Sequence, residues 1–431
     1  MELKTKWLLS RSKSCSCTMS GVWRAVAFSK GCAVIFHSPL GCVHVASDMD
    51  MGSQYRIMSE GSREDMDAVP LISSNIREKD TIFGGVNRLH QCISYVMETY
   101  RPECLFIASS CVAGVIGDDV EQEAEDAEME YGIPVVSVAY AGFLGGGYSD
   151  GYYKTANKIV DQFFTEQKHI KGRVLLLGDQ LGPWAQYALE VKRLLSLFGL
   201  TAEYQFPGYV PFNKWKNITD AEWIVMLGTG GKSGELHDLA EKIGVRYKIP
   251  VLTKKYPIGW ENTKAWIREI GMRLGENDKT DGIIQEEEHR LDEYVKTIEH
   301  ITKNKKAVIG IGRGSKWYDP ADTIHSIKRL GMNLEGIIFY KNLSDEEKNI
   351  YSKKIKSYTD SPIYDESSGL TIMEQADILL TTNELLSIRT KQFFIPMMPM
   401  AGTNGEISIL RTLYRILCRY GNKGGITYAT V

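Results

Sequence analysis

The chain of 431 residues is too long for a single hydrophobic core, so its length predicts two to four domains. Its 51 Lys and Arg residues against 54 Asp and Glu residues give a net charge of −3 without a basic stripe, which excludes nucleic acid as an expected partner. The opening residues lack the apolar run of a secretory signal, and no stretch approaches the ~18 consecutive apolar residues of a membrane span, so we expect a cytoplasmic protein without membrane contact.

Short apolar runs alternate with amphipathic stretches along the first third of the chain. A strand followed by a loop is predicted within residues 31–42 and again within 103–111, then a helix over 120–131 that Gly132 closes, and a strand over 133–140. This order is typical of βαβ units, in which helices cover a parallel sheet.

The same alternation begins again near residue 172 and a third time near residue 305, where it ends in a C-terminal helix. Between these two starts, the acidic stretch 278–300 is predicted to be an exposed helix. We therefore predict an α/β protein of three Rossmann-like domains, each with a parallel sheet flanked by helices. The expected domains are residues 1–168, 169–290 and 291–431.

Seven of the eight cysteines lie within the first 111 residues. Disulfides are disfavoured in a cytosolic chain, and clustered cysteines indicate metal binding or catalysis, although several can also be small buried packing residues. For Cys32, Cys92 and Cys104, which lie inside apolar or amphipathic patterns, burial is the better interpretation, and the isolated Cys418 is interpreted as structural.

Cys17, Cys42 and Cys111 stand in predicted loops, and the last two follow predicted strands. Parallel sheets bind ligands beyond the carboxyl ends of their strands. Small neighbours, among them Gly41 and Gly114, leave room for a bulky inorganic group, and backbone N–H donors there would tune an iron–sulfur cluster.

Three cysteines are one ligand short of four. The missing ligand can be a non-cysteine group, another cysteine such as Cys15, or a residue of a second chain, and Cys15 could also take the place of Cys17.

Other motifs favour structural roles. The segment 226–235 fails the phosphate-loop template because Met226 stands where a glycine is required, and 310–315 is best interpreted as a tight turn. The pair Asp118–Asp119 is predicted to cap a helix, and His37 is assigned a structural hydrogen bond in preference to a cluster contact.

The order of these segments resembles the nitrogenase component 1 family. The resemblance covers about residues 15–155 and is carried by Cys17, "HSPLGC" (37–42), "REKDTIFGG" (77–85), "SSCVAGVIGDD" (109–119) and "IPVVSVAYAGFLGG" (133–146). The motif around Cys111 is somewhat more similar to the β-type subunit than to the α-type.

The resemblance implies that Cys17, Cys42 and Cys111 ligate an iron–sulfur cluster, either 4Fe–4S or a larger P-cluster-like group, at the interface of two homologous subunits. The 25-residue step from Cys17 to Cys42 suits the family, which favours Cys17 over Cys15. Electrons would come from a separate ATP-dependent iron–sulfur reductase. The oligomer would be a homodimer or a heterotetramer.

The sequence also departs from the family's catalytic subunit, which holds its molybdenum–iron cofactor through a cysteine of the second domain and a histidine of the third. The matching regions, 226–235 and 390–402, contain no Cys and no His respectively, so we do not expect this chain alone to reduce dinitrogen. Whether a second metallocofactor binds elsewhere is left open.

We therefore expect an oxygen-sensitive oxidoreductase subunit that passes low-potential electrons through an interfacial iron–sulfur cluster to a reducible substrate. The first alternative is a scaffold on which a nitrogenase-type metallocluster is assembled and handed on. The second is a Rossmann-type ligand-binding protein without a cluster.

Overall fold

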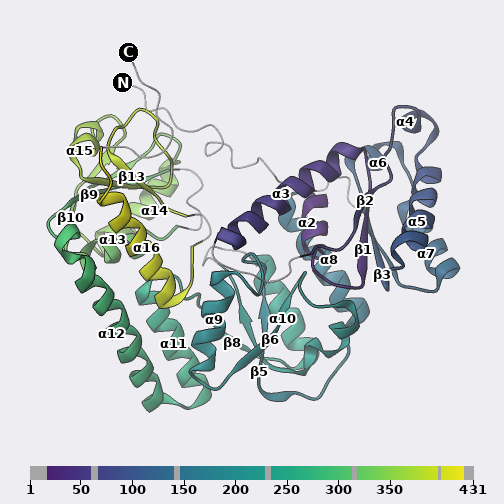
Figure 1. Ribbon diagram of the computed structural model, residues 1–431, viewed down its shortest axis with the longest axis horizontal. Helices are drawn as coiled ribbons and strands as arrows, with labels where there is room; N and C mark the ends of the chain where they lie inside the picture. Colours follow the sequence, from purple (N-terminus) through teal and green to yellow (C-terminus); the bar gives the residue numbers. More distant parts are fainter. Residues whose placement is uncertain are drawn as a thin grey trace. The chain divides into compact units, whose positions relative to one another are not determined.

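The computed structural model describes residues 17–59, 67–139, 146–228, 234–312, 318–396 and 399–421. They form three parallel sheets flanked by helices (Figure 1), which confirms the predicted fold class. The chain divides into two compact units. One holds the first and second sheets and ends at Lys254, and the other holds the third sheet and begins at Lys255.

The first sheet has the strand order β2-β1-β3-β4 and is parallel throughout. Its elements in chain order are α2 (Thr18–Arg24), β1 (Cys32–His37), α3 (Leu40–Ser59), β2 (Leu71–Ser73), α4 (Asp80–Phe83), α5 (Val86–Tyr100), β3 (Cys104–Ser109), α6 (Cys111–Ile116), α7 (Val120–Tyr131), β4 (Val135–Val138) and α8 (Tyr148–Phe163). Every residue of β1 and β3 is buried, because helices cover both faces of the sheet.

Side chains that alternate along β1 and β3 pack into two different layers. Ile35 and Ile107 lie in one core cluster with Leu89 of α5 and Val120 of α7. Figure 1 draws α5 and α7 on one side of this sheet and α2 and α8 on the other. The sheet is therefore a central layer between two layers of helices.

Helices α2 and α8 pack unusually closely. A Cβ atom added to Gly21 would lie 2.0 Å from the carbonyl oxygen of Tyr148, and one added to Gly151 would lie 2.0 Å from that of Thr18. Only glycine allows the two backbones to approach in this way. Gly21, four residues after Cys17, therefore makes room for α8.

The second sheet has the order β6-β5-β7-β8 and is also parallel. Its elements are β5 (Ile170–Leu177), α9 (Gln186–Ser196), β6 (Thr201–Phe206), the 3-10 helix η2 (Phe212–Asp220), β7 (Ala221–Met226), α10 (Gly234–Tyr247) and β8 (Val251–Thr253). Helix α10 contacts α8, which joins this sheet to the first one within their compact unit.

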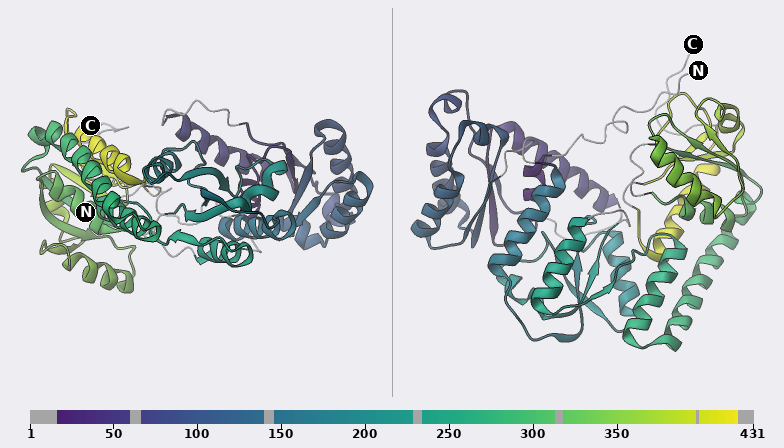
Figure 2. Two further views of the ribbon diagram at one scale, coloured as in Figure 1. Left: turned by 90° about the horizontal axis from the view of Figure 1, so that it is seen from below. Right: turned by 180° about the vertical axis from the view of Figure 1, so that it is seen from behind.

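The third sheet has five parallel strands in the order β11-β10-β9-β12-β13. The second unit comprises α11 (Trp260–Leu274), α12 (Asn277–Thr302), β9 (Lys306–Ile311), α13 (Pro320–Arg329), β10 (Asn333–Phe339), α14 (Asp345–Lys356), β11 (Ile363–Asp365), α15 (Leu370–Gln375), β12 (Ile378–Thr381), β13 (Lys391–Phe394) and α16 (Gly402–Leu417). Helix α12 packs against α16, the green and yellow helices that lie side by side in Figures 1 and 2.

The predicted acidic helix over 278–300 corresponds to α12. The expected boundary at residue 290 falls within this helix, and the division into three domains stays a prediction. No helix among the described residues combines the length and the apolar character that crossing a membrane requires.

Candidate functional site

Cys42 and Cys111 lie beyond the carboxyl ends of two neighbouring strands. β1 and β3 pair in register up to His37 and Ser109, and the Ser110 N–H donates to the His37 carbonyl at 3.1 Å. In the order β2-β1-β3-β4, the strand that follows β1 in the chain lies on one side of it, whereas β3 and β4 lie on the other side. The direction of the strand order therefore reverses between β1 and β3, which is the topological switch point of the sheet. Open parallel sheets bind their ligands at this point.

Both cysteines open helices, whereas the sequence predicted loops. Cys111 is the first residue of α6, and the Ser110 side chain caps this helix by accepting a hydrogen bond from the Ala113 N–H at 3.2 Å. Cys42 is the third residue of α3. Both thiols are half-buried free cysteines.

Cys17 is the third cysteine of the predicted site and lies at the N-terminal end of α2. It occupies the N-cap position of α2, is half-buried, and belongs to a helix that contacts both α3 and β3. Burial raises the pKa of the Cys42 thiol, a hydrogen bond with the Ser38 side chain lowers it, and the thiols of Cys17 and Cys111 raise it further. The pKa of Cys42 therefore responds to the other two predicted ligands, and the assignment of the three cysteines to one cluster stays a prediction.

The two predicted glycines are placed differently. Gly41 precedes Cys42, and a Cβ atom added to it would meet nothing within 4 Å, so the space beside Cys42 is open. Gly114 is exposed in α6, where its N–H donates to the Ser110 carbonyl at 2.9 Å. Their contact with a cofactor stays a prediction.

Among the described residues, no three Cys, His, Asp or Glu side chains converge on a point where one metal ion could bind. Thiolates are the ligands of iron–sulfur clusters, so the half-buried thiols of Cys17, Cys42 and Cys111 are chemically suited to hold one. That they do so together stays a prediction.

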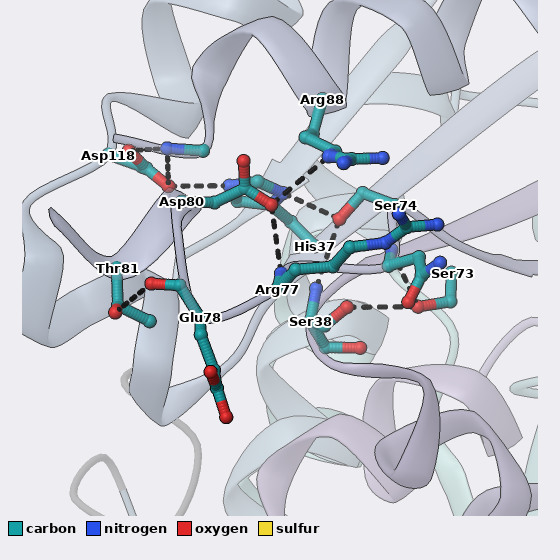
Figure 3. A network of polar contacts seen from close by, with 12 residues as sticks. His37, Ser38, Ser73, Ser74, Arg77, Glu78, Asp80, Thr81, Arg88 and Asp118 are labelled. Atoms are coloured by element: carbon teal, nitrogen blue, oxygen red, sulfur yellow. Dashed lines mark hydrogen bonds and ion pairs between the residues drawn. The ribbon is translucent and has the colours of Figure 1, made fainter. Parts of the chain in front are cut away.

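His37 and Ser38 belong to a buried hydrogen-bond network (Figure 3), and the Ser38 side chain also bonds to Cys42. His37 Nδ1 lies 2.8 Å from Ser74 Oγ, and its Nε2 lies 2.8 Å from Asp118 Oδ2. Asp118 also accepts the Gly85 N–H at 2.8 Å. Burial lowers the pKa of His37 and outweighs the raising effect of Asp118, so the imidazole is neutral near pH 7.

The structure separates the roles of the two adjacent aspartates. Asp119 caps α7 as predicted, because its side chain accepts the Gln122 N–H at 3.0 Å. Asp118 is not a cap: it points into the His37 network, which the sequence did not predict. A local sequence pattern carries no signal for this contact, since His37 and Asp118 are separated by 81 residues.

Exposed apolar side chains lie on the helices that carry Cys42 and Cys111 and on α4, which contacts α6. Ile82 and Phe83 of α4 are 77% and 86% exposed, and Val115 of α6, which contacts α4, is 73% exposed. A second group follows α3 and consists of Leu40, Val45, Met51, Tyr55 and Met58. We call these the α4–α6 patch and the α3 stripe. Apolar surface of this kind marks places where other molecules bind.

Three of the remaining cysteines match the sequence interpretation, because Cys32, Cys92 and Cys104 are buried. Cys418, which the sequence interpreted as structural, is exposed, so burial gives that interpretation no support. Parts of three glycine-rich segments that the sequence singled out, 140–145, 229–233 and 313–317, lie outside the described residues.

Comparison with known proteins identifies the family. The sequence model of the family described as nitrogenase component 1 type oxidoreductase matches residues 17–414. The chain belongs to the nitrogenase component 1 family. For this family member, the expected relationship is confirmed over almost the whole chain, well beyond residues 15–155.

Several relatives of this nitrogenase component 1 family member are named for cofactor biosynthesis. The nitrogenase iron-molybdenum cofactor biosynthesis protein NifE of Nostoc sp. is 23% identical, with 94% of this chain and 86% of the relative covered. The NifE protein of Clostridium pasteurianum is 29% identical over 69% of this chain and 62% of its own length.

A catalytic relative and a solved structure complete the comparison. The nitrogenase molybdenum-iron protein alpha chain of Methanosarcina barkeri is 24% identical over 74% of this chain and 58% of its own length. The structure of nitrogenase Cp1 at pH 5 shares the fold, with a TM-score of 0.61, 17% identity, and coverage of 94% of this chain and 88% of that one. Because the named subunit relative is an alpha chain, the leaning toward the β-type subunit rests on the motif around Cys111 alone.

Proposed function

We propose that this chain is a scaffold on which a nitrogenase-type metallocluster is assembled and from which the cluster is handed on. The observation that carries this proposal is the similarity, over 94% of the chain, to a protein named for iron-molybdenum cofactor biosynthesis. The sequence alone favoured an electron-relaying reductase subunit and kept the scaffold as its first alternative. The relatives support the alternative better.

Two regions of the sequence lack cofactor-anchoring side chains, which is consistent with the function of a scaffold. The region 226–235 has no cysteine and 390–402 has no histidine, so the side chains that anchor a cofactor permanently in the family's catalytic subunit are absent. A scaffold must release its cluster, and weaker anchoring serves release.

Cys17, Cys42 and Cys111 are the ligands we propose. The raised pKa of Cys42 keeps its thiol protonated in the metal-free chain, so metal binding would displace the proton and compensate the buried charge. Partial burial of all three thiols limits the access of water and oxygen. An iron–sulfur cluster bound there would supply low-potential electron storage.

The two exposed apolar surfaces support two partners. The α3 stripe extends from Leu40 to Met58 along one helix, and a long apolar contact of this kind suits a permanent interface with a homologous subunit that adds the missing ligands. The smaller α4–α6 patch suits the brief docking of an ATP-dependent iron–sulfur reductase, because transient electron-transfer contacts are small.

Electron relay to a substrate is the second candidate, and the similarity to a nitrogenase alpha chain favours it. The two candidates differ in the fate of the metal. A scaffold loses its cluster to an acceptor protein, whereas a reductase subunit keeps its cluster through many turnovers.

The deciding experiment measures iron and acid-labile sulfide on anaerobically purified chain, before and after incubation with a cofactor-deficient nitrogenase component 1. We expect about two to four or more irons per chain, loss of metal from the chain, and activation of the acceptor. Cys42→Ala should lose the iron, and Cys418→Ala, which removes an exposed thiol elsewhere, should keep it. Retained metal together with reductase-dependent substrate turnover would favour the reductase subunit, and an iron-free wild-type chain would refute both.

A further inference from the structure

The hydrogen bonds around His37 have only one consistent direction. The Asp118 carboxylate can only accept hydrogen bonds, so the neutral imidazole donates its Nε2–H to Asp118 Oδ2. Nδ1 is then an acceptor, and the Ser74 hydroxyl, whose oxygen accepts the Ser38 N–H at 3.2 Å, donates to it. Each of these groups has its partner within the network.

The network joins the two segments that carry Cys42 and Cys111. His37 ends β1, five residues before Cys42. Asp118 lies seven residues after Cys111, and the short helix α6 between them is closed by hydrogen bonds from the N–H groups of Gly117 and Asp118 to the Ala113 carbonyl. The contact between His37 and Asp118 thus fixes two segments that are far apart in the sequence.

The surroundings leave this contact little freedom. The side chain of His37 is fully buried, and that of Asp118 is 3% exposed. A Cβ atom added to Gly85 would lie 2.6 Å from Asp118 Oδ2 and 3.1 Å from His37 Cε1, so the glycine is required there. Ser74 and Gly85 come from two further segments, which makes the contact the meeting point of four (Figure 3).

We propose that His37 and Asp118 are positioning residues that hold Cys42 and Cys111 at a fixed separation before a cluster binds. The inference rests on the proposed function in taking these cysteines as ligands. A site that is already arranged loses no affinity to the ordering of its ligands, and groups that orient ligands typically change metal affinity by about 10–100-fold when removed.

The chain offers a matched pair of variants. Asp118→Ala removes the acceptor for both His37 and Gly85, whereas Asp119→Ala removes the neighbouring carboxylate, which only caps α7. Asp118→Asn is the conservative variant, because its amide oxygen can still accept the Gly85 N–H while its amide nitrogen donates to an imidazole in the other tautomer.

The first measurement needs no metal. Nitroxide labels are placed on Cys42 and Cys111 of the metal-free chain, with Cys15, Cys17 and Cys418 replaced by serine, and the spread of their separation is taken from dipolar broadening in the EPR spectrum. We expect a narrow spread in the parent, Asp119→Ala and Asp118→Asn chains and a clearly wider one in Asp118→Ala. An unchanged spread in Asp118→Ala would overturn the proposal.

The second measurement follows iron loss to a chelator from the anaerobically purified chain. Asp118→Ala should lose iron about tenfold faster or more, and Asp118→Asn should restore retention to near the wild-type level. If Asp118→Ala does not fold, His37→Gln takes its place in both measurements, since Gln can still donate to Asp118 but cannot reach Ser74 at the same time. An iron-free wild type with the expected label spread would refute the proposed function and leave the positioning role intact, whereas normal iron retention in the breaking variants would refute the positioning role.

Discussion

Cys42 lies half-buried, and burial makes its thiolate costly until a metal compensates the charge. The cost is moderated by the Ser38 side chain, whose hydrogen bond lowers the pKa of Cys42. At the opposite end of β1, burial raises the pKa of the Cys32 thiol well above the usual range, and a hydrogen bond with Cys104 adds to the effect. The two thiols thus differ in their surroundings, because Cys42 is half-buried beyond the carboxyl end of β1 and Cys32 is packed at its start.

Asp322 of α13 provides a prediction for the third sheet's unit. Burial raises the pKa of Asp322 from 3.8 to about 8, and the carboxylates of Asp319 and Glu406 add to the effect. Between about pH 4 and pH 8 the unfolded chain has lost this proton and the folded chain keeps it. The stabilisation is therefore complete below pH 4 and is lost as the pH rises toward 8.

We expect urea unfolding to give a lower free energy at pH 8 than at pH 5, and Asp322→Asn to remove most of this slope. Asn262, which donates to Asp322 Oδ1 at 3.1 Å, can still bond to the amide oxygen. Asp345→Asn, at an exposed carboxylate of α14, serves as the control and should keep the slope. Equal slopes in wild type and Asp322→Asn would show that other groups cause the pH dependence.

Helices and strands were largely predictable because their signals are local. The apolar runs of β1 and β3 and the closure of α7 by Gly132 follow from residue type and spacing. Two elements of the site were not predicted. Where its side chains are described, α3 exposes apolar residues among polar ones and so lacks the buried apolar face that gives a helical period, and β2 has only three residues.

Strand order lies beyond local patterns as well. The adjacency of β1 and β3 depends on pairing between segments about seventy residues apart, as in Ile35 with Ile107. The sequence placed Cys42 and Cys111 after strands, but only the order of the sheet puts them at the same switch point. The contact between His37 and Asp118 was not predictable for the same reason, because 81 residues separate the two in the sequence.

The close contact of α2 and α8 leads to a prediction for these elements. Gly21→Ala would place a Cβ atom 2.0 Å from the Tyr148 carbonyl oxygen, which is backbone and cannot turn away. We expect a loss of about 1–3 kcal/mol in unfolding free energy and, because Cys17 occupies the N-cap position of α2, weaker iron retention.

Gly52→Ala is the matched control, since it makes the same change within α3 where nothing lies within 4 Å. It should stabilise the metal-free chain by about 0.5–1 kcal/mol and leave iron retention unchanged. Urea unfolding and iron analysis of both variants test the pair. A stable Gly21→Ala chain would mean that α2 and α8 can separate without harm to the fold.

For the whole molecule, family membership was predictable and function only in part. The family match extends over residues 17–414 and includes parts of both compact units, while the motifs that revealed it lie in the first sheet. The three proposed cysteine ligands would serve an electron relay and an assembly scaffold equally well, because both need a bound cluster. The scaffold is favoured by relatives that match most of the chain. The cysteine site itself does not distinguish the two functions.

The two apolar surfaces make the final prediction, which separates two partners. Phe83→Ser in the α4–α6 patch should leave folding and sedimentation unchanged and raise the concentration of reductase required for half-maximal cluster reduction by about tenfold. Tyr55→Ser in the α3 stripe should leave the required concentration of reductase unchanged and reduce the share of assembled oligomer in sedimentation velocity.

Each variant is the control for the other, because both remove an exposed aromatic ring from the same compact unit. The measurements use anaerobically purified chain and the ATP-dependent iron–sulfur reductase of the same organism, with cluster reduction followed by EPR. If Phe83→Ser altered the oligomer and Tyr55→Ser the reductase dependence, the two surfaces would have exchanged roles. If neither variant had an effect, partners would have to approach the cysteine site from another side, and the half-buried thiols would be covered by a surface other than these two.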